Sequence, residues 1–492
     1  MIMELYYSIR PLLAVLVSLC AVPFIVLSPR PNIRETVSFI AAGLKFALVI
    51  SMLPVILNGH QIIFTLMNVL PGAPIQFRVD ALGMLFGIVS SFLWIVTTTY
   101  SIGYMRGLDE HAQTRYFCFF AIALSATIGV AFAANLLTLY LFYEILSLAT
   151  YPLVTHHQDD EARISGRKYL TYILGTSIGF VLPAMLYVYH VTGTLDFSAL
   201  GVLGGKAHPT TLIVVLFLFI FGFAKAAIMP FHAWLPAAMV APTPVSALLH
   251  AVAVVKVGIF SIIRVLLYTF GTKELMGLHV GPAVSYVASF TIIIGSLIAL
   301  SQDNLKRLLA YSTISQLSYI ILGVALLSPR GMTGGLIHIP MHAFGKITLF
   351  FCAGAIFVAT GKKNLSEMHG IGKRMPITMI AFFIASLSII GLPPCGGFLS
   401  KWNLLLGSLQ SHQAIALVVL LVSSLLNAAY FMPIIYKAFF LRDQGSGQGI
   451  REAPLFCVVP LCVTSLLSIA MFFYPQPFYK LIKLVIHQLL GA

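Results

Sequence analysis

The chain has 492 residues, of which 59% are hydrophobic and only 9% are charged, and its mean hydropathy is +0.97. Soluble domains carry about 25% charged residues, so this composition excludes a soluble protein and predicts an integral membrane protein. The formal net charge of +14 comes from cations spread over short loops. Such cations are a signal of membrane topology, and we expect no nucleic-acid partner.

Apolar runs of roughly 20 residues predict an all-α protein with about 14 transmembrane helices. The expected limits are 11–28, 36–57, 81–105, 115–133, 136–154, 169–191, 211–229, 245–268, 281–301, 309–327, 333–359, 376–400, 413–439 and 453–474. A short amphipathic tail follows. We divide the chain into three N-terminal helices (1–110), a first repeat (111–268), a second repeat (281–440), and helix 14 with the tail (453–492).

The distribution of Lys and Arg predicts the topology. Loops after odd-numbered helices hold sixteen of these residues, Arg442 among them, whereas loops after even-numbered helices hold four. Because cytoplasmic loops carry the excess of cations, we expect both termini on the non-cytoplasmic side of the cell's inner (plasma) membrane.

One acidic residue interrupts an apolar span. Fourteen of the fifteen Asp and Glu fall in loops or at span ends, and the exception is Glu144 in NLLTLYLFYEILSLATYPL. A buried glutamate bonded to a neighbouring hydroxyl is the plain structural interpretation. A functional role beside a buried lysine is the favoured one, because ionisable residues at membrane depth are costly.

The stretch from 222 to 260 contains two lysines within apolar helical sequence, Lys225 and Lys256, and His250 between them. Pro230 cannot donate to the carbonyl of residue 226, so we expect the helix to break one turn past Lys225. Broken backbone at membrane depth is tolerated where protein or a water-filled cavity covers it. The stretch therefore predicts part of an ion pathway.

Helix eleven carries His338, His342 and Lys346 at a spacing of four, which places all three on one face. Because histidine titrates near neutral pH, this stripe suits proton transfer. A metal site is the rival interpretation, but no carboxylate or thiolate accompanies the pair and Lys346 would repel a cation. Histidines that are simply satisfied by neighbouring helices are the third possibility.

A second interruption, at Pro393 and Pro394, precedes Lys401 in SIIGLPPCGGFLSKWNLL. Two Pro- or Gly-interrupted segments with a nearby lysine each predict two inverted repeats with an ion site in each half. Lys45 lies within span two, and its role stays open. The six cysteines form no C-x-x-C pair, so we expect no metal and no cofactor site.

Six stretches resemble antiporter-like membrane subunits of the complex I superfamily. They are NLLTLYLFYEILSL, KAAIMPFHAWLP, APTPVSALLHAVAVVKVG, DNLKRLLAYSTISQLSY, HAFGKITLFF and GLPPCGGFLSKW, and they span about residues 80 to 440. That superfamily includes NADH–quinone oxidoreductases, membrane-bound hydrogenases and Mrp-type cation/proton antiporters.

The resemblance implies a row of buried charged residues along the membrane midplane. It implies that Glu144 pairs with Lys225, that Lys256 and Lys401 continue the row, and that His250, His338 and His342 act as relays. Many family members have acidic residues where this chain has Ala237 and Val240, which argues against a role for carboxylates in that loop.

The resemblance further implies proton translocation as a subunit of a complex I-like respiratory or hydrogenase assembly, with no catalytic site of its own. The expected partners are other membrane subunits, including paralogous antiporter-like subunits, and a redox arm. Three alternatives stay open: a subunit of an Mrp-type sodium/proton antiporter, a stand-alone secondary transporter, and a passive membrane anchor.

Overall fold

The computed structural model describes residues 4–28, 30–441 and 449–490. Within these residues, twelve helices are long and apolar enough to cross a membrane. The shortest has 18 residues, which at 1.5 Å per residue spans about 27 Å, close to the thickness of a bilayer's hydrocarbon core. The chain is therefore a multi-pass membrane protein, as its composition predicts.

Ten of the twelve long helices are continuous or nearly so. They are α1 (Arg10–Leu27), α2 (Pro31–Leu57), α3 (Ala81–Gly107), α4 (Gln113–Ala131), α5 (Leu136–Val154), α13 (Gly281–Leu300), α14 (Leu305–Ala325), α15 (Pro329–Thr360), α19 (Ala414–Phe440) and α20 (Leu455–Phe473). The other two contain π-helical turns. One joins α6 (Asp160–Thr176) to α7 (Leu182–Thr192), and the other runs through α10 (Thr243–Ala247) and α11 (Val254–Arg264) to Phe270.

Shorter helices complete the described fold. They are α8 (Pro209–Gly222), α9 (Trp234–Ala237), α12 (Thr272–Gly277), α16 (Ile371–Arg374), α17 (Pro376–Ile390), α18 (Gly397–Gln410) and α21 (Gln476–Leu490). The apolar helices α8 and α17 fall below the length of a full crossing, so the exact count of fourteen spans stays a prediction.

Within the described residues, a small β-sheet departs from the expected all-α fold. Strand β1 (Leu5–Tyr7) pairs in parallel with β2 (Gln61–Leu70), which pairs antiparallel with β3 (Ala73–Val79). The β2–β3 hairpin turns at Pro71 and Gly72, and its strands are rich in β-branched and aromatic residues. Such runs on either side of a Pro-Gly pair favour a hairpin.

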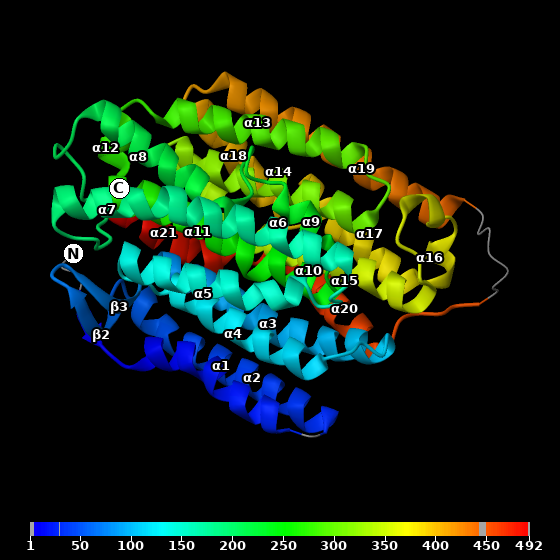
Figure 1. Cartoon of the computed structure of the whole chain (residues 1–492). Coiled ribbons are helices and arrows are strands. Elements are labelled where there is room, and N and C mark those ends of the chain that lie inside the picture. Colours follow the sequence, from blue (N-terminus) through cyan, green and yellow to red (C-terminus); the bar gives the residue numbers. More distant parts are fainter. Residues whose placement is uncertain (1–3, 29, 442–448, 491–492) are drawn as a thin grey trace.

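The helices lie side by side and form one bundle (Figure 1). Helices α13 and α19 run along one edge of the view and α1 and α2 along the opposite edge, with α11 and α14 between them. The span Thr243–Phe270 is wholly buried, whereas only a third of the most apolar part of α2 is buried. Helix α15 packs against α14, α17, α18 and α20, so α15 and the span Thr243–Phe270 form the centre of the bundle.

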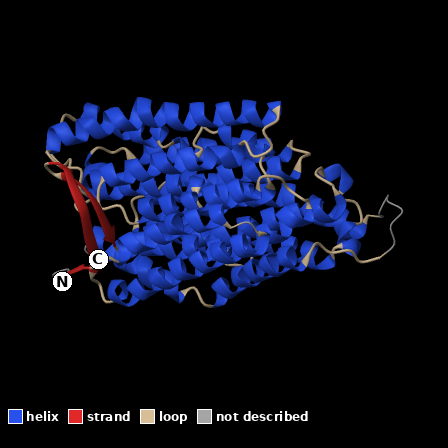
Figure 2. Ribbon diagram, turned by 60° about the horizontal axis from the view of Figure 1, so that its bottom comes forward, coloured by secondary structure: helices blue, strands red, loops and turns tan. Residues whose placement is uncertain are grey.

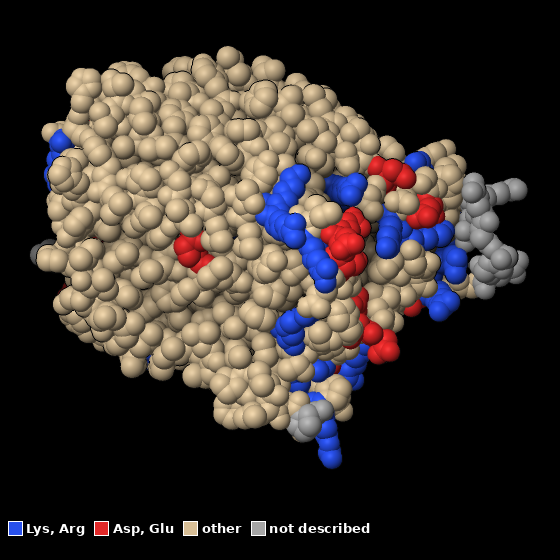
Figure 3. Space-filling view, in the orientation of Figure 1, with Lys and Arg blue, Asp and Glu red and all other residues tan. Residues whose placement is uncertain are grey.

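Both ends of the described chain lie at the same end of the bundle, beside the β-sheet (Figure 2). On the face seen in Figure 3, Lys, Arg, Asp and Glu gather towards the opposite end, and a wide band is largely free of charge. This band is the surface expected to contact lipid. Arg442, one of the sixteen loop cations, lies outside the described residues.

The predicted amphipathic tail forms helix α21, and one of its faces is buried. The buried residues are Leu481, Ile482, Val485 and Leu489. This face packs against α3 and α15. The tail is thus part of the bundle.

Candidate functional site

Helix α8 ends three residues before Lys225, so the prediction that it breaks one turn past this lysine, at Pro230, is wrong in position. Its last residue is Gly222, and Lys225 lies in the 3₁₀ turn Ala224–Ala226. Pro230 accounts only for the missing hydrogen bond to the carbonyl of residue 226, and not for the end of the helix at Gly222. Contacts with other helices end α8 earlier: Trp234 Nε1 donates to the Ala224 carbonyl at 2.9 Å, and the Lys225 amide donates to the Tyr143 hydroxyl at 3.3 Å.

The ammonium of Lys225 is fully buried and bonded to α5. It donates to the carbonyl of Tyr143 and to the hydroxyl of Ser147, each at 2.6 Å. A buried charge requires partners of this kind, because desolvation is otherwise far too costly. The break in the helix therefore brings the ammonium of Lys225 against α5.

Glu144 is linked to Lys225 through one hydroxyl. The Ser147 hydroxyl lies 3.2 Å from Glu144 Oε2 and 2.6 Å from Lys225 Nζ. Within the described residues no direct ion pair joins Glu144 and Lys225, so their pairing stays a prediction. Glu144 is half-buried, and its α5 neighbours Ile145 and Leu148 are exposed, which places Glu144 at the edge of the bundle.

Lys256 follows a π-helical turn that the sequence did not predict. This turn, Leu248–Val252, contains His250, and Ala253 after it has φ −105° and ψ −80°. π-turns inside helices occur frequently at functional sites. Lys256 Nζ lies 2.9 Å from His342 Nδ1 on α15, and both side chains are buried.

The predicted stripe on α15 is present in the middle of the bundle. The rings of His338 and His342 have centroids 5.7 Å apart. His338 Nδ1 lies 2.8 Å from the Ser400 hydroxyl, and Lys346 donates to the Leu309 carbonyl at 3.3 Å. The three residues thus share one buried face, although Lys346 bonds to α14 rather than to the histidines.

Lys401 lies beside the second interruption. Pro393 and Pro394 fall between the end of α17 at Ile390 and the start of α18 at Gly397. The last carbonyls of a helix have no partner within it, and Lys401 Nζ donates to one of them, that of Ile390, at 2.9 Å. Gly391 has φ +90°, and a Cβ there would lie 2.5 Å from Lys401 Cδ.

The structure connects most of the predicted residues in two groups. Glu144, Ser147 and Lys225 form the first. The second comprises Lys256, His342, His338, Ser400, Tyr319 and Lys401. The ring of Tyr319 stacks on His338 with centroids 5.5 Å apart, and Lys401 Nζ lies 4.9 Å from the centroid of the same Tyr319 ring. His250 contacts the Phe350 ring, and among the described residues its two nitrogens have no hydrogen-bond partner. Buried nitrogens of this kind suit bound water.

Several buried contacts of the bundle were not predicted from the sequence. Ser147 could have been found, because it lies three residues after Glu144 on one helix face. Lys45, whose role the sequence left open, is fully buried and donates to the Leu124 carbonyl at 2.9 Å. A bidentate ion pair between Arg264 and Asp80, at 2.5 and 2.7 Å, gave no sequence signal because the partners are 184 residues apart.

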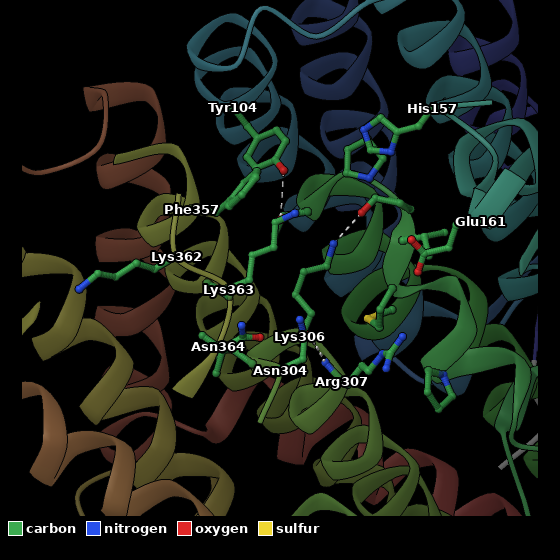
Figure 4. A pocket seen from close by; sticks show the side chains of 18 of the residues that line it. Tyr104, His157, Glu161, Asn304, Lys306, Arg307, Phe357, Lys362, Lys363 and Asn364 are labelled. Atoms are coloured by element: carbon green, nitrogen blue, oxygen red, sulfur yellow. Dashed lines mark hydrogen bonds between the residues drawn. The ribbon is translucent and has the colours of Figure 1, made fainter. Parts of the chain in front are cut away.

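A cavity of about 600 Å³ opens at the charged end of the bundle (Figure 4). Its walls carry Glu110, His157, Lys306 and Lys363, and Tyr104 and Thr243 also line it. Lys306 Nζ donates to the Ala241 carbonyl at 2.6 Å, and the hydroxyls of Thr243 and Tyr104 are 3.3 Å apart. Thr243, which lines the cavity, and His250 belong to one helical span that is buried throughout.

The chain is similar to known proteins over most of its length. Residues 133–427 match the family described as NADH:quinone oxidoreductase/Mrp antiporter, TM. The NADH-quinone oxidoreductase subunit N of Desulforudis audaxviator (strain MP104C) is 33% identical over 443 residues, which cover 87% of this chain and 86% of that protein. Several other relatives are longer, and the chain spans 37 to 63% of their length.

Two solved structures share the fold. The Mrp complex from Dietzia sp. DQ12-45-1b matches with a TM-score of 0.87 at 23% identity, over 98% of this chain and 97% of the matched chain. The membrane-bound sulfane sulfur reductase, an archaeal respiratory membrane complex, matches with a TM-score of 0.87 at 25% identity, over 98% of both chains. The chain belongs to the NADH:quinone oxidoreductase/Mrp antiporter membrane family.

Proposed function

We propose that this chain translocates protons across the membrane along its buried row of titratable residues. The observation that carries the proposal is the contact of Lys256 with His342, which lies beside His338. From His338, contacts reach the Ser400 hydroxyl directly and Lys401 through the Tyr319 ring. Ionisable residues inside membrane proteins mark ion pathways and proton relays. This row crosses from the first predicted repeat to the second.

The geometry supports stepwise transfer of a proton. A proton on Lys256 can pass to His342 along their 2.9 Å hydrogen bond. Like charges repel strongly at low dielectric, so a second positive charge at Lys225 would favour transfer away from Lys256. Glu144 would counter this effect when it lies close to Lys225, and the Ser147 hydroxyl connects the two. Movement of Glu144 relative to Lys225 would thus regulate proton transfer along the row.

The cavity at the charged end supports an entry route. Tyr104 and Thr243 line this cavity. Ser246 lies between Thr243 and His250 in the chain, and its buried hydroxyl has no protein partner among the described residues. Buried polar groups without protein partners suit ordered water, through which protons can move. Protons would therefore enter from the side where the loop cations gather, which the positive-inside rule assigns to the cytoplasm.

The proposed setting is the plasma membrane, with both termini on the non-cytoplasmic side. The proposed partners are paralogous antiporter-like subunits and a redox arm, in an assembly like those named for the relatives. The interruptions beside Lys225 and Lys401 support two inverted repeats with one interrupted segment in each. We propose no redox cofactor within this chain.

An Mrp-type sodium/proton antiporter is the second candidate. It is favoured by the similarity to a chain of the Mrp complex from Dietzia, which is matched over 97% of its length. Transport that depends on external Na⁺ in the absence of any electron donor would select this candidate.

The test is proton translocation by the purified assembly in proteoliposomes. Lys225→Ala should abolish acidification of the lumen while the assembly still forms, because the first buried group loses its cation. Exposed His412 provides the matched control in His412→Ala, which should leave translocation unchanged. Undiminished translocation by Lys225→Ala would point to a passive anchor.

A further inference from the structure

A cluster of one carboxylate and two imidazoles lies at the charged end of the bundle, outside the proposed proton row. Glu110 and His111 belong to the loop between α3 and α4, and His156 follows α5. One ligand atom of each lies within 4.8 Å of the other two. Glu110 Oε2 is 3.7 Å from His156 Nε2 and 3.9 Å from His111 Nδ1. We propose that these three side chains bind a Zn²⁺-like divalent transition-metal ion.

The ligand chemistry fits zinc. Zinc is bound by imidazole nitrogen and carboxylate oxygen at about 2.0–2.2 Å, usually with tetrahedral geometry, which places ligand atoms about 3.3 Å apart. The two contacts of Glu110 Oε2 are thus within about half an ångström of that spacing. Because the three ligand atoms lie only within 4.8 Å of one another, they must come closer to bind the ion, and the 52% exposed side chain of His111 is free to move.

A second observation points to a ligand. His156 is fully buried, yet neither of its ring nitrogens has a hydrogen-bond partner among the described residues. Buried polar atoms nearly always have one, so this ring is either strained or held ready for a further partner.

Hydrogen bonding orients His111 as a ligand. Its Nε2 lies 3.0 Å from the carbonyl of His156, which only a protonated nitrogen can donate to. The proton is thus placed on Nε2, and the lone pair on Nδ1 faces Glu110. Metal-binding histidines commonly donate their other N–H to a backbone carbonyl in this way.

His157 is less suitable than a water molecule as the fourth ligand of the metal. Its Nε2 already forms a hydrogen bond, at 3.4 Å, with the other oxygen of Glu110. We therefore expect a water molecule as the fourth ligand, on the side where Glu110 and His157 line the cavity (Figure 4). The metal would fasten the α3–α4 loop to the end of α5. It is separate from Lys225 and Lys256, so its presence does not depend on the proposed function.

The experiment measures Zn²⁺ binding by the purified full-length protein in its native assembly, after treatment with a chelator. Competition with a chromophoric chelator gives affinity and stoichiometry, and Co²⁺ substitution gives the coordination geometry from its visible spectrum. We expect His156→Ala and Glu110→Gln to remove one tight site per chain. His412→Ala, an exposed histidine at the α18–α19 turn, is the matched control and should retain it.

His111→Ala keeps the test decisive if a buried substitution prevents folding, because this side chain is the most exposed of the three. It should weaken binding at least tenfold. Equal affinity in the wild type and in His111→Ala, or a Co²⁺ spectrum typical of a hydrated octahedral ion, would overturn the proposal.

Discussion

The ammonium nitrogen of Lys256 lies 2.9 Å from Nδ1 of His342, although the two residues are 86 positions apart. Lys256 comes from α11 and His342 from α15, and both helices belong to the buried centre of the bundle. A lysine and a histidine in contact can exchange a proton only if both nitrogens can hold it in turn. Mutation of this contact is therefore the most direct test of the proposed mechanism.

His342→Gln should block transfer and preserve the fold. The glutamine amide oxygen can accept from Lys256, but it cannot take up a proton. General acid–base groups contribute about 10²- to 10⁴-fold to rates, so we expect a loss of proton flux of about this size in proteoliposomes. The thermal midpoint should stay close to that of the wild type. Normal flux in His342→Gln would remove this histidine from the pathway.

Ser147→Ala should remove the hydroxyl that links Lys225 to Glu144. The variant removes one of two acceptors of a buried ammonium, and loss of a buried hydrogen bond costs about 1–3 kcal/mol. We expect slower proton flux and a lower thermal midpoint in detergent. Ser147→Thr restores the hydroxyl and should recover both. If the threonine variant is as slow as the alanine variant, the hydroxyl is not the connection.

Gly258→Ala should push α11 away from the turn that carries Lys225. A Cβ at Gly258 would lie 2.2 Å from the amide nitrogen of Ala226 and 2.4 Å from the carbonyl carbon of Lys225. Overpacking of this kind typically costs about 1–3 kcal/mol. Gly175→Ala, on α6 with open space around it, is the matched control and should not destabilise. The measurement is thermal unfolding of both variants in the same detergent.

Asp80→Asn should leave the buried Arg264 without a counter-charge. Removing one partner of a buried ion pair typically costs about 3–5 kcal/mol. Asp80 also caps α3 through the amide of Gly83, and asparagine can keep that bond, so the loss reports mainly on the charge. Asp160→Asn, where the side chain is 95% exposed, should leave the midpoint unchanged. Equal midpoints for the two variants would contradict this assignment.

Much of the outline could be predicted from composition and spacing. The apolar runs predict the long helices because a membrane span needs about 20 consecutive apolar residues. The spacing of His338, His342 and Lys346 predicts their shared face because α-helical geometry is regular. The hairpin at Pro71 and Gly72 was not predicted.

Where the helices break was not predictable in detail. Pro230 suggested a break after Lys225, yet α8 ends at Gly222 because Trp234 and Tyr143 take up backbone groups there. The π-turn at His250 contains neither proline nor glycine, so local sequence carried no sign of it.

The amino-acid sequence is enough to identify a membrane protein with lysines, histidines and one glutamate at membrane depth, because ionisable residues are rare in membrane spans and are recognised wherever they occur. Which of these residues meet is established by the packing of the helices. Glu144 reaches Lys225 through Ser147, Lys256 meets His342, and Arg264 pairs with Asp80. These partners lie on different helices, and their contact depends on how the helices pack, which no local pattern in a chain specifies.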